Sequence, residues 1–170
     1  MLIYREWSMP NKWTFEMPVV KRLIQKYNVG LNWIDPFCGQ SNVAEYRNDL
    51  AVDKIDAFDF LSKFNTSTLT GCLFDPPYSM EQTKRSYQSI GIADWQTRYG
   101  NNKNGGFPNV KDQIARILYP NGYCISFGWN SNGLGKKRGF EIIEVVLIAH
   151  GGNHNDTIVT VEQKSTNLTD

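Results

Sequence analysis

The sequence predicts an α/β protein built on a three-layer, mostly parallel β-sheet with an antiparallel hairpin at one edge. Two observations lead to this prediction. Stretches with helical apolar spacing alternate along the chain with short apolar runs, as in strands joined by crossover helices. The last two apolar runs, 140–149 and 157–163, are separated only by a short polar segment, as in a C-terminal hairpin.

The chain has 170 residues, of which 41% are hydrophobic and 21% are charged, an ordinary globular composition. We expect a single domain over residues 1–170. The three cysteines are far apart and odd in number, which argues against a disulfide framework and favours a reducing compartment such as the cytoplasm. No apolar run approaches the roughly 20 residues of a membrane-spanning helix, so we expect no membrane partner.

Helices are predicted over 18–28, 56–64 and 109–118. The first opens with Pro18, which is tolerated at the start of a helix, and places apolar residues such as Val19 and Leu23 at helical spacing. The other two begin at Asp56 and Asn109, residue types whose side chains accept hydrogen bonds from the first N–H groups of a helix.

Strands are predicted over 31–37, 44–50, 69–74, 123–128, 140–149 and 157–163. Turn residues bound these runs, including Pro120-Asn121-Gly122 before the fourth one. In open α/β sheets, ligands bind beyond the carboxyl ends of the strands. Three of these ends carry unusual residues: Asp35-Pro36-Phe37, Asn48-Asp49 and Asp75-Pro76-Pro77-Tyr78.

The stretch 79–108 is polar and ends in the run 100–106, which is rich in Gly and Asn. We interpret it as a long, mostly irregular and mobile loop. Loops of this length are uncommon in compact domains unless they are functional or disordered. The stretch is therefore a candidate for contacts with a large substrate.

The segment Asp75-Pro76-Pro77-Tyr78 has the chemistry of an amine-binding site. The two prolines fix the backbone and remove two N–H donors, so their carbonyl groups are available to accept hydrogen bonds. A carboxylate, bare carbonyls and an aromatic ring together suit an exocyclic amine on a planar ring. A rigid turn without a ligand is the structural alternative.

With its preceding residue, Phe74, this segment resembles the catalytic motif of the amino-group DNA methyltransferases, which methylate adenine N6 or cytosine N4. Trp33 to Gly39 resembles the first S-adenosylmethionine (AdoMet) motif of the same family, and the segment 150–157 resembles one found in small phage or mobile-element adenine methylases. The resemblance covers residues 7 to about 163. It implies a Rossmann-like fold, AdoMet as methyl donor, and site-specific adenine N6 methylation of DNA in a bacterial or phage-infected cytoplasm, as in restriction–modification.

The resemblance also implies roles for individual residues. Asp75 and Pro76 would hold the target amine, with Pro77 completing the motif and Tyr78 stacking on a flipped base. The expected AdoMet contacts are Trp13, Thr14, Phe15, Asp35, Pro36, Phe37, Asp49, Asp56 and Ala57. The acid that would bind the ribose is ambiguous, because Asp49 ends a predicted strand and Asp53 follows shortly after it. We choose Asp49.

Two departures from the family pattern bear on function. Gly39 is followed by Gln40-Ser41-Asn42 in place of a Gly-rich loop. No separate target-recognition region is evident, so we expect the loop 79–108, a second copy of the chain or a separate specificity partner to supply recognition. The expected substrate contacts are Lys84, Arg85, Arg98, Lys103, Trp129 and His154.

His150 and His154 flank a Gly-Gly pair, but no Cys or carboxylate set completes a metal site, and we expect no metal. Three other functions remain open: an RNA methyltransferase, a protein-amide methyltransferase, and a non-catalytic AdoMet- or nucleic-acid-binding subunit. In the first two groups the motif usually begins with Asn, so Asp75 favours DNA. The intact tetrapeptide argues against a non-catalytic subunit.

Overall fold

The structure, a computed structural model, describes residues 1–9, 11, 13–93 and 107–166. Its strands are β1 (Leu2–Trp7), β2 (Trp33–Asp35), β3 (Tyr46–Arg47), β4 (Leu69–Phe74), β5 (Leu118–Gly128), β6 (Phe140–Ala149) and β7 (Thr157–Lys164). Its α-helices are α1 (Pro18–Lys26), α2 (Leu50–Asp53), α3 (Ala57–Ser62), α4 (Met80–Ser89) and α6 (Pro108–Ile117). Two short 3₁₀ helices are η1 (Thr14–Glu16) and η2 (Lys136–Arg138).

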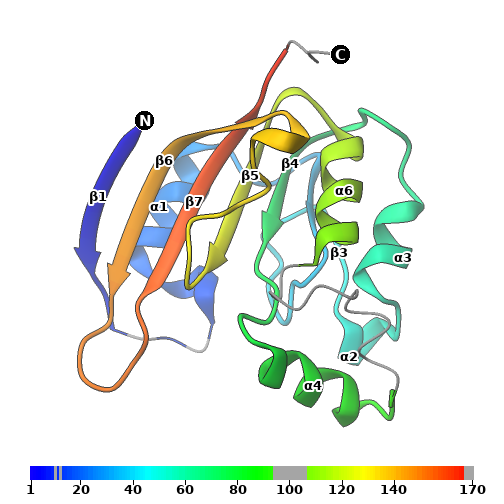
Figure 1. Ribbon diagram of the computed structural model, residues 1–170, viewed down its shortest axis with the longest axis horizontal. Helices are drawn as coiled ribbons and strands as arrows, with labels where there is room; N and C mark the ends of the chain where they lie inside the picture. The colour runs from blue at the N-terminus through cyan, green and yellow to red at the C-terminus, as the bar shows by residue number, and fades with distance from the viewer. Residues whose placement is uncertain (10, 12, 94–106, 167–170) are drawn as a thin grey trace.

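The strands of the described residues form one sheet in the order β1-β6-β7-β5-β4-β2-β3 (Figure 1). Neighbouring strands run parallel except at β7, which is antiparallel to both β5 and β6. The predicted α/β class, the mostly parallel sheet and the C-terminal antiparallel hairpin are therefore confirmed. The hairpin does not lie at the edge, however, because β1 pairs with the outer side of β6.

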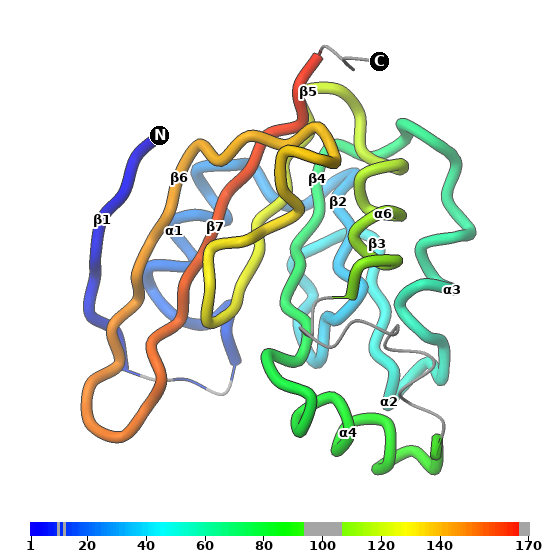
Figure 2. The backbone as a smooth tube through the Cα atoms, in the orientation of Figure 1, coloured from blue at the N-terminus to red at the C-terminus, as the bar shows by residue number. Residues whose placement is uncertain are grey.

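The edge strand β1 was not predicted. It runs parallel to β6 over its whole length, from Leu2 opposite Glu144 to Trp7 opposite Ala149 (Figure 2). Most of its side chains are exposed, including Ile3 and Trp7. A strand that buries so little apolar surface leaves only a weak hydrophobic pattern in the sequence.

Helices cover both faces of the sheet, which gives the three predicted layers (Figure 1). On one face, α1 packs its buried Val19, Val20 and Leu23 against strand residues such as Ile125. On the other face, α3 and α6 pack into a second core. Because these layers fix the central strands, the segments beyond the strand ends have defined positions.

The predicted strand 44–50 is wrong at its C-terminal end, because β3 contains only Tyr46 and Arg47. Asp49 starts the short helix α2 instead, and its side chain accepts hydrogen bonds from the N–H groups of Ala51 and Val52. The capping carboxylate competes with continued strand pairing, as Asp commonly does.

The prediction of a mostly irregular loop over 79–108 is wrong for its first part. Residues 80–89 form α4, which begins at Ser79 with the Ser79 hydroxyl accepting a hydrogen bond from the N–H of Gln82. This segment is rich in residues that favour helices, and its polarity hid that preference. The later residues 94–106 lie outside the described residues.

The predicted turn at Pro120-Asn121-Gly122 lies within the long strand β5, where the pairing register with β4 shifts and Asn121 adopts a left-handed backbone conformation. The other predicted strands and the three predicted helices are confirmed, with Asp56 as a cap of α3. The helix α6 is capped by Phe107, so the predicted cap at Asn109 is wrong. Within the described residues, none of the helices has the length and apolar character needed to cross a bilayer.

Candidate active site

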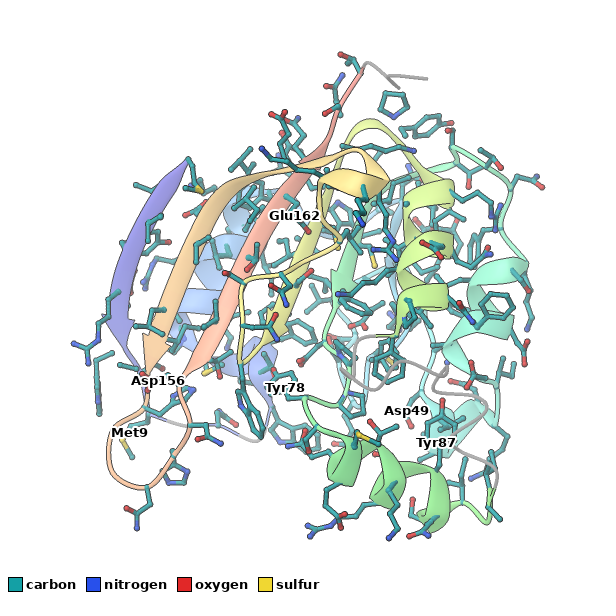
Figure 3. All side chains as sticks on the ribbon, viewed as in Figure 1. Met9, Asp49, Tyr78, Tyr87, Asp156 and Glu162 are labelled. Carbon is teal, nitrogen blue, oxygen red and sulfur yellow. The ribbon has the colours of Figure 1, made fainter. Side chains whose placement is uncertain are left out.

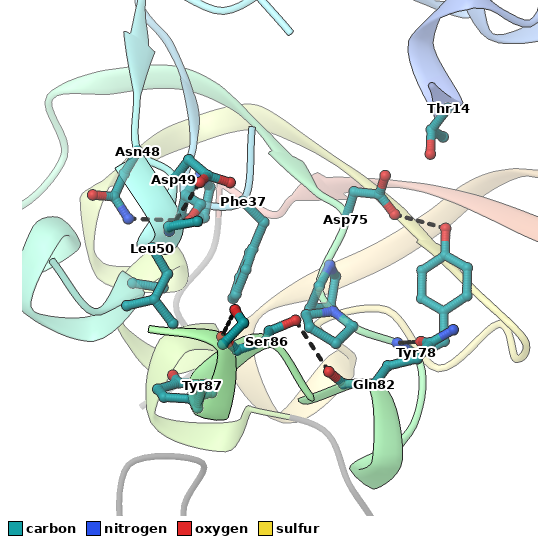
Figure 4. Close-up of a pocket in the computed structure, with 16 residues that line it drawn as sticks. Thr14, Phe37, Asn48, Asp49, Leu50, Asp75, Tyr78, Gln82, Ser86 and Tyr87 are labelled. Carbon is teal, nitrogen blue, oxygen red and sulfur yellow. Dashed lines mark hydrogen bonds between the residues drawn. The ribbon is translucent and has the colours of Figure 1, made fainter. Parts of the chain in front are cut away.

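Two adjoining cavities of about 390 Å³ each lie beyond the carboxyl ends of β2 and β4. The first is bounded by the segments after β2, β3 and β4 and by α4, and the second by η1 and the loop 38–43. They share Thr14, Phe37 and Asp75 in their linings. Asp75 therefore stands where the two cavities meet, as Figure 4 shows for the first cavity.

Asp75 follows the last residue of β4, and the side chain of Tyr78 lies close to the Asp75 carboxylate. The Tyr78 hydroxyl donates a hydrogen bond of 2.6 Å to Asp75 Oδ1. Burial raises the pKa of Asp75 above its ordinary value, while the hydrogen bond from Tyr78 and the nearby Thr14 side chain oppose that rise. Pro76 and Pro77 line the first cavity beside Asp75. The arrangement places a carboxylate and proline carbonyl groups at the same strand end.

The segment after β2 places Pro36 and Phe37 in the first cavity. Asp35, in contrast, is completely buried and lies outside the described linings of both cavities. Its Oδ1 accepts a hydrogen bond of 3.0 Å from the N–H of Phe37, and burial holds its pKa well above the ordinary value. Asp35 thus shapes the turn that carries Phe37, and its contact with a cofactor remains a prediction.

Asn48 and Asp49, which follow β3, both line the first cavity. Asp49 Oδ1 accepts both capping hydrogen bonds of α2, at 2.9 and 3.1 Å. Asp53 lies outside the described lining, and its Oδ2 accepts a hydrogen bond of 2.7 Å from the N–H of Asp49. Of the two acids considered for the ribose, the structure brings Asp49 to the cavity.

Asp56 is buried, and its side chain makes two hydrogen bonds within the chain. Oδ1 accepts one of 2.9 Å from the N–H of Phe58, and Oδ2 accepts one of 2.5 Å from the Tyr87 hydroxyl. Ala57 lines the first cavity, whereas Asp56 does not reach its described lining. Of this predicted adenine-binding pair, only Ala57 is placed at the cavity wall.

The N-terminal segment Trp13-Thr14-Phe15 lines the second cavity, together with Glu16. On the opposite side, the loop from Cys38 to Val43 replaces a Gly-rich turn and contributes every one of its residues to the lining. The lining of this cavity therefore includes Gly, Gln, Ser and Asn residues, and Glu16 and Asp75 are its charged residues within the described part of the chain.

Trp129 lies beside Tyr78 at the end of β5. Their rings meet edge to face, with centroids 5.8 Å apart and an interplanar angle of 72°. Both residues line a third cavity of about 60 Å³ on the other side of Pro76 and Pro77. Trp129 is thus close to the predicted amine-binding segment, as expected, although it does not line either larger cavity among the described residues.

The predicted nucleic-acid contacts are only partly placed. Lys84 and Arg85 lie on α4, where Arg85 is exposed and pairs with Glu81 at 3.2 Å. Arg98 and Lys103 lie outside the described residues. His154 is exposed in the loop between β6 and β7. The buried His150 contacts the Ser8 carbonyl and the Thr157 hydroxyl, both at 2.9 Å, so its role is structural.

The helix α4 contributes cavity residues that sequence reasoning missed: Gln82, Ser86, Tyr87 and Ser89. Figure 3 shows Tyr87, Asp49 and Tyr78 at the same end of the molecule. Residues 82, 86 and 89 follow helical spacing, so recognition of the Ser79 cap would have identified this polar face. Within the part of the chain that the structure describes, no group of three His, Cys, Asp or Glu side chains is arranged to hold a metal ion.

No protein-family model matches the chain, and no curated protein matches it either. Similar solved structures include TrmN from Thermus thermophilus (16% identity, 87% of this chain and 49% of TrmN covered, TM-score 0.49). A second is a candidate DNA modification methylase, also from Thermus thermophilus, with 12% identity and a TM-score of 0.41, and the match covers 68% of this chain and 53% of that protein. A third is a candidate methylase from Haemophilus influenzae, with 12% identity and a TM-score of 0.35, and the match covers 96% of this chain and 71% of that protein. The chain spans about half of the length of the first two proteins.

Proposed function

We propose that the protein is an AdoMet-dependent methyltransferase that transfers a methyl group to the N6 amine of adenine in DNA. The observation that carries this proposal is the position of Asp75. The carboxylate of a segment that resembles the amino-methyltransferase motif lies where two cavities of about 390 Å³ meet.

The chemistry of the two cavities supports AdoMet as the ligand. AdoMet is an elongated molecule with a nucleoside at one end and an amino acid at the other. Asp49 in the first cavity is an acceptor for ribose hydroxyl groups, and Phe37, Leu50 and Ala57 offer apolar surface to the adenine ring. The backbone of the loop 38–43, with Trp13 and Phe15, would hold the methionine end in the second cavity.

When bound, AdoMet would supply the methyl group: the carbon–sulfur bond would break with its electron pair left on sulfur, a carbon–nitrogen bond to the amine would form, and the nitrogen would release one proton to solvent. The chain supplies acceptors for that nitrogen. The Asp75 carboxylate and the Pro76 carbonyl would each accept one N–H of the amine, which aims its lone pair at the cavity junction. Tyr78 and Trp129 offer aromatic surface to the base beside these acceptors.

For nucleic-acid binding, the proposal relies on basic and aromatic residues that follow the motif. Lys84 and Arg85 stand on α4, next to the cavity wall. We include Arg98 and Lys103 as phosphate contacts on the sequence pattern alone. We also propose that base recognition comes from the segment 79–108, from a second copy of the chain or from a specificity partner.

The test is transfer of a tritiated methyl group from AdoMet to DNA, RNA and protein in parallel, followed by identification of the methylated base. The proposal predicts N6-methyladenine in DNA. Label in RNA or protein alone would move the assignment to those substrates. AdoMet binding without transfer to any of the three would favour a non-catalytic subunit.

A further inference from the structure

We propose that the hydroxyl groups of Tyr78 and Thr14 are positioning groups that hold the Asp75 carboxylate as an aimed acceptor at the junction of the two cavities. This inference rests on the proposed function and adds a role to each residue. Tyr78 was expected as a stacking surface and Thr14 as a cofactor contact.

The Tyr78 contact is short and well supported by its surroundings. Its hydroxyl donates to Asp75 Oδ1 at 2.6 Å, in the distance range of strong hydrogen bonds to carboxylates. The Tyr78 ring is held on one side by the edge-to-face contact with Trp129. Its backbone N–H donates to Gln82 Oε1 at 2.6 Å, which ties it to the first turn of α4. Two contacts besides the one to Asp75 therefore fix Tyr78, and it can fix Asp75 in turn.

Thr14 reaches Asp75 from a distant part of the chain. It opens η1 at the N-terminal side, and it shares both cavity linings with Asp75. Figure 4 shows its side chain directed toward Asp75. The Tyr78 hydrogen bond and the nearby Thr14 hydroxyl favour the charged form of the Asp75 carboxylate, whereas burial disfavours that form. The two hydroxyl groups thus oppose the effect of burial on Asp75 and can orient its carboxylate.

A positioning role differs from two simpler roles in its kinetic signature. If Tyr78 only stacks on the base, removal of its hydroxyl leaves the kinetics unchanged. If the hydroxyl only blocks Asp75 until a base arrives, its removal lowers the KM for DNA and leaves kcat unchanged. If the hydroxyl holds the acceptor, its removal lowers kcat and leaves the KM for DNA unchanged.

The experiment compares kcat and KM for DNA across a pH series, at saturating AdoMet, for Tyr78→Phe, Thr14→Val and the wild-type protein. We expect each variant to lose about tenfold in kcat, the effect of one hydrogen bond to a charged group. The acid limb of the kcat profile should move to higher pH, because loss of a donor to the carboxylate raises the pKa of Asp75 further. The KM for DNA should stay the same.

Two controls separate this role from a loss of structure. Thr14→Ser keeps the hydroxyl and should restore both kcat and the acid limb. Tyr4→Phe removes a matched hydroxyl, which donates a hydrogen bond of 2.9 Å to Glu144 away from both cavities. This variant should change neither kcat nor the acid limb.

The proposal is overturned if Tyr78→Phe and Thr14→Val keep the wild-type kcat and acid limb, or if Tyr78→Phe lowers the KM alone. It is also overturned if Thr14→Ser behaves like Thr14→Val. If the wild-type protein transfers no methyl group to DNA, the proposed function itself fails, which is a distinct result.

Discussion

Tyr87 donates a 2.5 Å hydrogen bond to Asp56, and this bond joins α4 to the start of α3. Both side chains are buried. The other oxygen of Asp56 caps α3 through the N–H of Phe58. One carboxylate thus fixes two walls around the first cavity, since Tyr87 and Ala57 both line it.

Tyr87→Phe should lower the free energy of unfolding by about 1–3 kcal/mol, because a buried carboxylate oxygen loses its donor. Urea unfolding followed by circular dichroism measures this change. Tyr119→Phe is a suitable control, since Tyr119 is 46% exposed, and its unfolding curve should match that of the wild-type protein. Equal stability of Tyr87→Phe and Tyr119→Phe would contradict a stabilising role for the Tyr87–Asp56 bond.

Asp75→Ala should reduce methyl transfer by at least about 10²–10³-fold, the usual effect of removing a preorganised electrostatic partner of the reacting group. AdoMet binding should be largely retained, because the carboxylate is assigned to the target amine. Transfer of tritiated methyl groups and calorimetric titration with AdoMet measure the two effects separately. Unchanged turnover would refute the assigned role, and loss of AdoMet binding would reassign Asp75 to the cofactor.

Asp49→Ala should weaken AdoMet binding more than Asp53→Ala does. Both carboxylates take part in hydrogen bonds around α2, but Asp49 alone of the two lines the first cavity within the described residues. The Asp53→Ala variant therefore removes a carboxylate from the same helix without removing a residue of the described cavity lining. Calorimetry on both variants is the measurement, and equal losses of affinity would refute the assignment of Asp49 to the ribose.

Glu144→Gln should destabilise the protein at neutral pH by about 1–3 kcal/mol, and the loss should shrink in acid. Burial opposes the charge of Glu144, but hydrogen bonds from Lys26, Tyr27 and Tyr4 outweigh it and lower its pKa. A lowered pKa in the folded state stabilises the fold above the ordinary value of 4.5, and this contribution is lost as the pH falls through the folded-state value. Urea unfolding of the wild-type protein and of Glu144→Gln at pH 7 and pH 3 would show whether the difference between their free energies of unfolding is smaller at pH 3.

Replacement of Arg98 and Lys103 by Ala should weaken DNA binding and flatten its salt dependence by about two units of slope, since each neutralised phosphate contributes close to one. The affinity for AdoMet should not change. Fluorescence anisotropy at several salt concentrations measures the slope. An unchanged slope would shift nucleic-acid binding to other residues or to a specificity partner.

Much of the fold could be predicted because its central strands are continuous apolar runs that end at Asp-Pro dipeptides. The runs before Asp35 and Asp75 are buried, and such runs are identifiable from composition alone. The helix α4 and the edge strand β1 were not predicted, because neither forms a continuous apolar run. One is a mostly polar helix and the other a mostly exposed strand, so neither has a strong apolar period.

The position of a residue at the cavity could be predicted where it follows from a strand end, as for Pro36, Phe37, Asp49 and the segment 75–78, whose roles stay predictions. It was not predictable where three-dimensional packing decides which atoms face the cavity. Asp35 and Asp56 have the expected residue type and position, yet both oxygens of Asp56 and Oδ1 of Asp35 accept hydrogen bonds from N–H and hydroxyl donors of the chain itself. Asp35 Oδ2 is buried without a hydrogen-bond partner among the described residues. A sequence motif does not show how a carboxylate is bonded within the fold.

The pairing of β1 with β6 has a consequence for how the chain is made. Leu2 lies opposite Glu144, so β1 can pair only after the chain has been synthesised through β6, which lies far along the sequence. Such long-range pairing carries a large loop-closure entropy and slows folding. Until then Ile3 and Trp7, which remain exposed even in the finished sheet, are open to chaperones and to other nascent chains.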